Sequence, residues 1–116
     1  MIPFFTVITI LFMHYVADFR WQTPWQAENK SKNNWALITH VMTYTVGLFL
    51  CAPMILPDVP AAIWVGYNAV MHFLVDYVSS RESSRRFGQW HDFFETIGGD
   101  QFLHYVTLFM SYVALS

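Results

Sequence analysis

Histidine and aspartate side chains recur in the apolar stretches of this sequence at a spacing that suits metal binding. In three of four such stretches an imidazole and a carboxylate are four positions apart, which places them about 6 Å apart on one helix face. Histidine comes first in two of these pairs, aspartate comes first in the third, and the fourth stretch carries a lone histidine. Imidazole nitrogens and carboxylate oxygens together are typical ligands of divalent metals. The residues are His14, Asp18, His40, His72, Asp76, Asp100 and His104.

The composition is that of a membrane protein. Of the 116 residues, 55% are hydrophobic and 12% are charged, which is too apolar for an ordinary soluble domain. Cys51 is the single cysteine, so neither a disulfide within the chain nor a C-x-x-C metal site can form. The six basic residues and the net charge of -2 give no indication of a nucleic-acid partner, and no DNA is expected.

Four apolar segments are expected to cross a lipid bilayer as helices within one integral membrane domain, residues 1–116. The fold class is therefore all-α, a four-helix transmembrane bundle with a short interfacial amphipathic helix before the fourth span. The four spans are expected at about residues 3–20, 35–56, 61–80 and 100–116, and the interfacial segments at about 23–30 and 87–97.

Local signals set several of these boundaries. Thr23 can cap a short helix, Pro24 suits its first position, and Gln26 can complete a capping box. The pair Gly98-Gly99 is expected to end the amphipathic helix, so that the fourth span begins at the next residue.

The basic residues predict the orientation of the bundle. They lie in the first and third connections and are missing from the second, so those two connections should face the cytoplasm and both termini the periplasm. In this topology the reversed order of Asp100 and His104 is cancelled by the opposite direction of the fourth span. All three aspartates then lie at the cytoplasmic end of the bundle, and the imidazoles lie about one turn deeper.

This arrangement predicts a dinuclear metal site. Ionised carboxylates in a low-dielectric setting cost several kcal/mol each unless they are paired, and divalent ions supply the missing charge. A set rich in imidazole and without thiolate favours one or two zinc ions, with manganese or iron as alternatives. Two such ions would activate water and clamp a phosphoryl oxygen, which predicts metal-assisted hydrolysis.

Further polar residues surround the predicted ligands. Four could hold imidazole N–H groups or a substrate oxygen, namely Gln22, Tyr44, Asn68 and Gln101. Three could receive a phosphate or an anionic headgroup, although the positive-inside rule explains them equally well, namely Arg81, Arg85 and Arg86. His91 and Asp92 are candidates for acid–base roles at the rim, or are ordinary surface residues.

Three functions are compatible with these residues. The first is a hydrolase acting on a phosphoester, a lipid headgroup or a nucleotide, at the cytoplasmic face. The second is an ion or proton transporter, although the outer halves of the spans offer few polar residues to continue a path. The third is a noncatalytic membrane module stiffened by metal. The alternative to a metal site is a network of interhelical hydrogen bonds that only holds the bundle together.

The combined pattern resembles a known family. His14-x3-Asp18-Phe19-x2-Gln22, the lone His40, His72-Phe-x2-Asp76 and Asp100-Gln101-x2-His104 are similar to motifs of small bacterial and phage inner-membrane proteins catalogued as a domain of unknown function. More distantly, the pattern resembles LexA-regulated membrane-bound metal-dependent hydrolases and the zinc sites of phospholipase C and related nucleases. The resemblance implies an inner-membrane location, metal ligation by the seven residues and phosphoester hydrolysis. The chain lacks the additional ligands that complete a trinuclear cluster in the soluble enzymes, which favours two ions or one.

Overall fold

The computed structural model describes residues 2–116, except for the side chain of Trp90, and in that part of the chain it is helical without strands. This confirms the all-α class. The elements are α1 (Phe4–Tyr15), the π-helical turn η1 (Val16–Arg20), α2 (Pro24–Asn29), α3 (Asn34–Ile55), α4 (Asp58–Arg85) and α5 (Trp90–Leu115).

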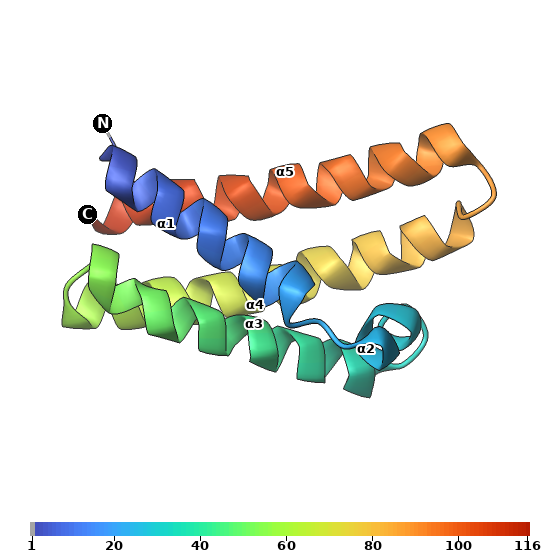
Figure 1. The fold of residues 1–116 in the computed structure, drawn as a ribbon, viewed down its shortest axis with the longest axis horizontal. Coiled ribbons are helices and arrows are strands. Elements are labelled where there is room, and N and C mark those ends of the chain that lie inside the picture. The colour runs from blue at the N-terminus through green and yellow to red at the C-terminus, as the bar shows by residue number, and fades with distance from the viewer. Residues whose placement is uncertain (1) are drawn as a thin grey trace.

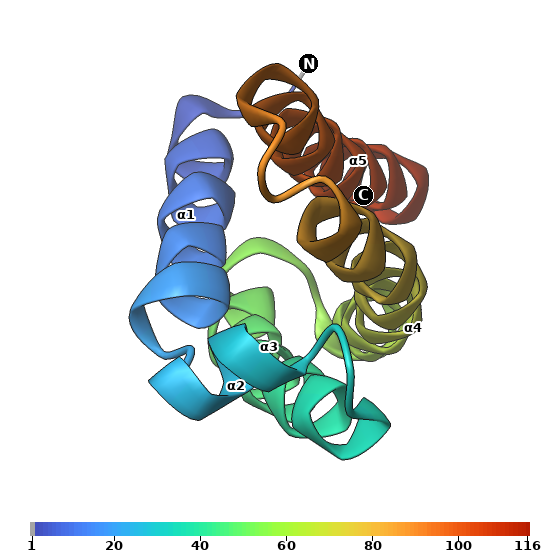
Figure 2. The same ribbon diagram turned by 90° about the vertical axis from the view of Figure 1, so that its right-hand side faces the viewer.

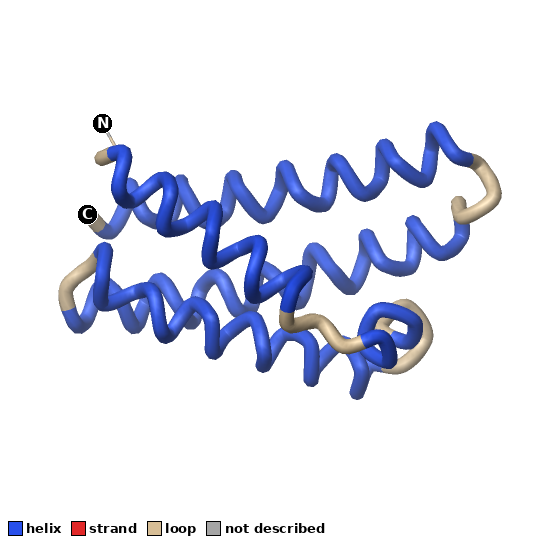
Figure 3. The backbone as a smooth tube through the Cα atoms, in the orientation of Figure 1, coloured by secondary structure: helices blue, strands red, loops and turns tan. Residues whose placement is uncertain are grey.

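The long helices lie side by side in alternating directions (Figure 1). Both chain ends and the α3–α4 turn lie at one end of the bundle, and the α4–α5 connection and α2 lie at the other. Viewed along the bundle, α1, α3, α4 and α5 surround a common centre, and α2 packs against α3 (Figure 2). The connections between them are short loops (Figure 3). Below, the end with the termini is called the terminal end, and the opposite end is called the α2 end.

The predicted capping box forms at the start of α2, and a side-chain cap also begins α3. The Thr23 backbone N–H donates to Gln26 Oε1 at 3.1 Å, and the Gln26 N–H donates to Thr23 Oγ1 at 3.1 Å, which completes the capping box. The Asn33 side chain accepts a hydrogen bond from the N–H of Trp35 at 2.9 Å. These caps turn the chain sharply between α1 and α3.

Helix α4 is longer than its predicted range of 61–80. It begins at Asp58, which places Pro60 in the first turn. Proline is tolerated there because N–H groups of the first turn have no partner within the helix. It continues to Arg85 because Glu82 pairs with basic side chains three and four residues later, which supports another helical turn.

The predicted break at Gly98-Gly99 does not form. Helix α5 is continuous from Trp90 to Leu115, and both glycines have ordinary helical backbone. A glycine costs a helix about 1 kcal/mol relative to alanine, which the flanking turns of a 26-residue helix can offset. The predictions of a separate interfacial helix at 87–97 and of a helix start at Asp100 are therefore wrong. The amphipathic segment is the first part of α5.

The terminal half of the bundle has an apolar core. Ile10, Leu48, Trp64 and Leu108 are fully buried, and the Trp64 indole N–H donates to the Leu108 carbonyl oxygen at 3.1 Å. The outer surfaces of the helices are also apolar, and they expose large side chains such as Phe4, Phe49 and Met110, which are exposed by 80%, 69% and 67%. By length and hydropathy, α3 is the one helix of the described residues that could cross a membrane, a test that the buried core helix of a soluble protein also passes.

Candidate metal centre

A π-helical turn presents the first carboxylate. In η1 the Trp21 N–H donates to the Val16 carbonyl oxygen, five residues earlier, at 2.8 Å. Such turns are rare and are often found at functional sites, because the additional residue redirects a side chain. Asp18, in the middle of this turn, is buried and points into the bundle.

Close packing brings η1 against α3. A Cβ atom added to Gly47 of α3 would lie 2.7 Å from the Cβ of Ala17, which is below any normal contact distance. Only glycine allows this approach without a shift. The result is that Asp18 Oδ1 lies 2.9 Å from His40 Nε2.

Three imidazoles from three helices face the Asp18 carboxylate. Besides the contact with His40, Asp18 Oδ1 lies 3.5 Å from His72 Nε2, and Oδ2 lies 3.5 Å from His14 Nε2. The Nε2 atoms of His40 and His72 are 3.3 Å apart. Nitrogen atoms at this distance form a normal pair only if one of them carries a proton and the other accepts it.

Asp76 is the second buried carboxylate, one turn beyond His72 on α4. Its Oδ2 atom lies 3.5 Å from His40 Nε2 and 3.1 Å from the ammonium nitrogen of Lys30, and its Oδ1 atom lies 4.0 Å from His104 Nε2. Asp76 is therefore placed between the imidazoles and the α2 end of the bundle.

Asp100 and His104 complete the cluster from α5. Because α5 is antiparallel to α4, the reversed order of this pair brings its carboxylate and imidazole level with those of α4, as the sequence predicts. His104 Nε2 lies 3.2 Å from Asp100 Oδ1. The same oxygen accepts a hydrogen bond from the Ser79 hydroxyl, and Oδ2 accepts one from Gln101 Nε2 at 2.8 Å.

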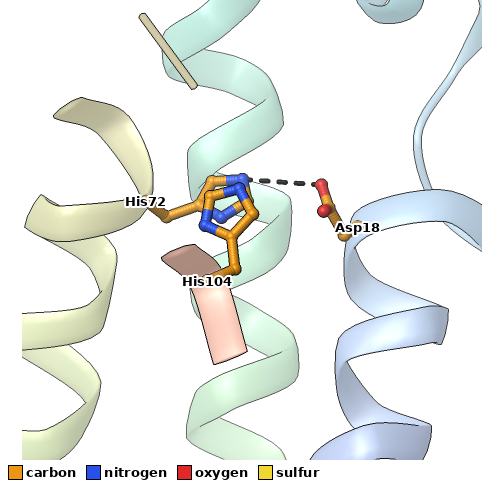
Figure 4. A group of neighbouring side chains, drawn as sticks. All are labelled: Asp18, His72 and His104. Atoms are coloured by element: carbon orange, nitrogen blue, oxygen red, sulfur yellow. Dashed lines mark ion pairs between the residues drawn. The ribbon is translucent and has the colours of Figure 1, made fainter. Parts of the chain in front are cut away.

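Aromatic stacking fixes the imidazole rings. The Tyr44 ring stacks on His72 with 3.8 Å between centroids, and His72 stacks on His104 with 4.1 Å. Figure 4 shows the two imidazoles overlapping, with Asp18 facing them from η1. This stack determines which way the ring nitrogens point.

Six of the seven predicted ligands form overlapping groups that could hold a metal ion. In each of the three groups within this cluster, the candidate ligand atoms lie within 4.8 Å of one another. The groups are Asp18, His72 and His104; His40, His72 and Asp76; and Asp76, Asp100 and His104.

The hydrogen bonding of the cluster supports this interpretation. His104 Nε2 and Asp76 Oδ2 are buried and make no hydrogen bond of good geometry, and each has a close ionic neighbour, Asp100 Oδ1 at 3.2 Å and the Lys30 ammonium at 3.1 Å. A bound cation with suitable geometry would satisfy both atoms. The donor set of imidazoles and carboxylates fits a divalent metal.

His14, the seventh predicted ligand, has both ring nitrogens engaged. Its Nε2–H donates to Gln101 Oε1 at 2.8 Å, which leaves Nδ1 to accept from the Tyr44 hydroxyl at 3.2 Å. His14 thus ties α1 to α3 and α5 in this structure. Tyr44 and Gln101 contact predicted ligands, as expected from the sequence.

The other two predicted supporting residues do not contact an imidazole. Gln22 lines a cavity at the α2 end, where its buried Oε1 has no partner. Asn68 Nδ2 donates to the carbonyl oxygen of Trp64 at 2.9 Å and to the Ser111 hydroxyl at 3.0 Å. Asn68 therefore joins α4 to α5 on the terminal side of the cluster.

The arginines proposed as anion-binding groups are engaged elsewhere. Arg81 donates to Asn34 Oδ1 at 2.7 Å and to the carbonyl oxygen of Tyr77 at 3.1 Å. Arg85 and Arg86 pair with Glu82 at 2.7 and 3.3 Å, and the hydrogen bond from Arg85 lowers the pKa of Glu82. None of these three arginines lines the cavity beside the cluster.

His91 and Asp92 are surface residues in the first turn of α5. The His91 side chain is 89% exposed, and its Nδ1 lies 3.5 Å from Asp92 Oδ1. Asp92 is eight residues before Asp100, about 12 Å along the helix axis. Neither residue lines the cavity.

A cavity of about 170 Å³ lies next to the carboxylates at the α2 end. Asp18, Asp76 and Asp100 line it together with Lys30, which the sequence analysis did not identify. Lys30 follows α2, and the turn made by the capping box returns it to the bundle, where its side chain is 18% exposed. No spacing in the sequence connects Lys30 to Asp76, so the contact could be found only from the fold.

Comparison with known proteins gives one match. The model of a family described as protein of unknown function, DUF3307, matches residues 6–116. No curated protein and no solved structure matches the chain.

Proposed function

This chain belongs to the DUF3307 family of proteins of unknown function, and we propose that it is a membrane-embedded, metal-dependent phosphoester hydrolase. The observation that carries the proposal is the buried cluster of carboxylates and imidazoles from α1–η1, α3, α4 and α5, next to a cavity.

The bilayer is supported by the outer surface of the bundle. α3, with 22 residues, is about 33 Å long, which matches the hydrocarbon core of a bilayer. Along the middle of all four long elements the exposed side chains are apolar, and the histidines there are buried. We propose that α1 with η1, α3, α4 and α5 all cross the membrane, although α3 alone meets the length and hydropathy test within the described chain.

The orientation follows from the charges. All six basic residues lie towards the α2 end, namely Arg20, Lys30, Lys32, Arg81, Arg85 and Arg86. The positive-inside rule then places the α2 end and the cavity at the cytoplasmic face of the inner membrane, with both termini on the periplasmic side.

The cluster suits one or two divalent ions, zinc first, with manganese or iron as alternatives. Such an ion supplies Lewis acidity to a phosphoryl oxygen and makes water a better nucleophile. The chain's own residues hold and orient the reacting groups. Asp18, Asp76 and Asp100 present oxygens to the cavity, and Lys30 places a positive charge beside them.

Side chains behind the ligands keep the cluster in place. The hydroxyl of Ser79 and the amide of Gln101 each donate to Asp100 and fix its carboxylate plane. On the far side the Tyr44 ring closes the site towards the apolar core. Water can therefore reach the cluster from the cavity side.

The same closure disfavours an ion or proton transporter. A transport path needs polar groups across the whole membrane. Beyond Tyr44 the bundle interior is filled by residues such as Leu48, Trp64 and Leu108. The polar region thus ends partway through the bundle.

Hydrolysis of a chromogenic phosphodiester and monoester by the detergent-purified protein tests the proposal. We expect turnover that a chelator abolishes and added zinc or manganese restores, and that Asp76→Asn removes. Asp58→Asn is the matched control, because Asp58 starts the same helix at the terminal end and is exposed. Metal binding without hydrolysis of any phosphoester, including lipid substrates, would instead favour the noncatalytic membrane module.

A further inference from the structure

A groove lies beside the cavity at the α2 end. It has a volume of about 580 Å³ and lies between the segment around α2 and the last turns of α4. Lys30, Ser80 and Ser83 line both the groove and the cavity, so the two spaces share a wall. A ligand in the groove would therefore lie beside the cavity that the carboxylates line.

The lining of the groove combines cations and hydroxyl groups with phenyl rings. Lys30 and Lys32 supply two positive charges and Glu28 one negative charge, so the lining has a net positive charge. Ser80, Ser83 and Ser84 lie along the α4 side. Phe87 and Phe93 line the same space. Ammonium and hydroxyl donors suit phosphate oxygens, whereas phenyl rings suit an apolar chain.

Ser80 provides an independent sign of a missing ligand. Its side chain is 94% buried, and its Oγ atom has no hydrogen-bond partner. A buried hydroxyl is normally satisfied, most simply by its own helix four residues back. Ser80 lines both spaces, so a rotation of its side chain would turn this hydroxyl towards a ligand there.

Lys30 is positioned to exchange partners. Its ammonium nitrogen lies 3.1 Å from Asp76 Oδ2, and its long, flexible side chain lines both spaces. A phosphate entering the groove would offer this cation a partner with more negative charge than one shared carboxylate oxygen.

From these contacts we propose that the groove binds the phosphoryl group of an amphiphilic phosphoester, a lipid phosphate, with Lys30 and Ser80 as its main donors. This inference rests on the proposed function and names the substrate class of that site. The phenyl rings and the apolar outer surface of the bundle favour a molecule that arrives from the bilayer. A soluble phosphoester shares the phosphate chemistry but would not use the rings.

Calorimetric titration of the detergent-purified protein separates these possibilities without relying on turnover. The probes are dioctanoyl phosphatidic acid and glycerol 3-phosphate, which share the phosphate and differ in the acyl chains. We expect the lipid to bind at least about tenfold more tightly, since burying even a few methylene groups contributes that much. Equal affinity for the two probes would overturn the lipid assignment in favour of a soluble phosphoester.

The variants test the two donors. Lys30→Gln should weaken lipid binding by about tenfold or more, and Ser80→Ala by about threefold to tenfold, the usual range for a charged and a neutral hydrogen bond. Arg85→Gln is the control, because it removes the same charge at the same end of the bundle from a residue outside both spaces. An equal loss of lipid affinity in Arg85→Gln and Lys30→Gln would show that the effect depends on net charge alone, and would overturn the assignment.

Two further results keep the test clear. Lys30→Arg keeps the positive charge and should bind the lipid within about threefold of the wild-type affinity. Lost binding in both variants would indicate that substitution at this position disturbs folding. Lipid binding that persists in a protein without hydrolytic activity would reject the proposed reaction alone. Hydrolysis of soluble esters without lipid binding would reject this inference alone.

Discussion

Trp64 and His72 lie about two turns apart on α4, and the environments of their buried nitrogen atoms differ. The Trp64 N–H is paired with a carbonyl oxygen of α5. His72 Nδ1 has no partner, and His72 Nε2 faces another histidine nitrogen and a carboxylate. Of the seven buried side-chain atoms without a hydrogen bond among the described residues, Asn68 Oδ1 lies on the terminal side of the cluster and the other six lie in the α2 half. The terminal half therefore resembles an ordinary packed core more closely than the α2 half does.

The difference separates stability from function within one small bundle. Groups that only hold a fold together are usually fully paired, since an unpaired buried group costs free energy. Departures from this rule are expected at sites that bind ligands. The variants below should therefore affect metal binding and folding separately, according to the half in which they lie.

The largest effect is expected from Asp18→Asn. It keeps the size of the side chain but removes the charge that faces His40 and His72, and we expect metal affinity to fall by at least about 100-fold. Competition with a metal-sensitive dye measures the affinity. Asp58→Asn should leave it unchanged, and equal losses in both variants would contradict a specific site.

Gly47→Ala tests the close approach that positions Asp18. The new methyl group would meet the Cβ of Ala17 at 2.7 Å, so we expect a loss of about 1–3 kcal/mol in the free energy of unfolding, with weaker metal binding. Gly66→Ala on α4 is the control, since its added Cβ meets nothing within 4 Å. We expect Gly66→Ala to be neutral or to stabilise the helix by about 0.5–1 kcal/mol in denaturant titrations.

Tyr44→Phe should have a smaller effect, limited to the α2 half. The ring that stacks on His72 remains, but His14 Nδ1 loses the hydroxyl that donates to it. We expect metal affinity to fall by about tenfold, the lower range for partners that orient a ligand. Unchanged affinity would mean that His14 plays no part in positioning the cluster.

The smallest effect on metal binding is expected in the terminal half, from Trp64→Phe. The loss of the hydrogen bond to Leu108 and of part of a fully buried ring should lower the free energy of unfolding by about 2–3 kcal/mol, and metal content should not change. Denaturant titration and elemental analysis of the same sample measure both quantities. A loss of metal from this variant would show that the two halves are coupled.

Local patterns in the sequence predicted much of this structure. The capping box of Thr23 and Gln26 depends on neighbouring residues alone, and it forms as predicted. The reversed order of Asp100 and His104 also predicted that Asp100 would lie level with Asp76 and His104 level with His72, because antiparallel packing cancels the reversal.

Features that depend on the whole fold could not be predicted in this way. Gly98-Gly99 was expected to break a helix, but the turns on both sides carry α5 through it. The contact of Lys30 with Asp76 joins residues far apart in the chain, and the engagement of His14 depends on Tyr44 and Gln101 from two other helices. Such contacts leave no periodic signal in the sequence.

Elemental analysis of the wild-type protein, purified in detergent and passed over a sizing column, tests the central claim most directly. We predict that about one or two divalent ions remain bound per chain, are removed by a chelator and return on addition of zinc or manganese. A protein that carries no divalent metal and takes none up would contradict this account. The histidines and aspartates would then be joined by direct hydrogen bonds alone.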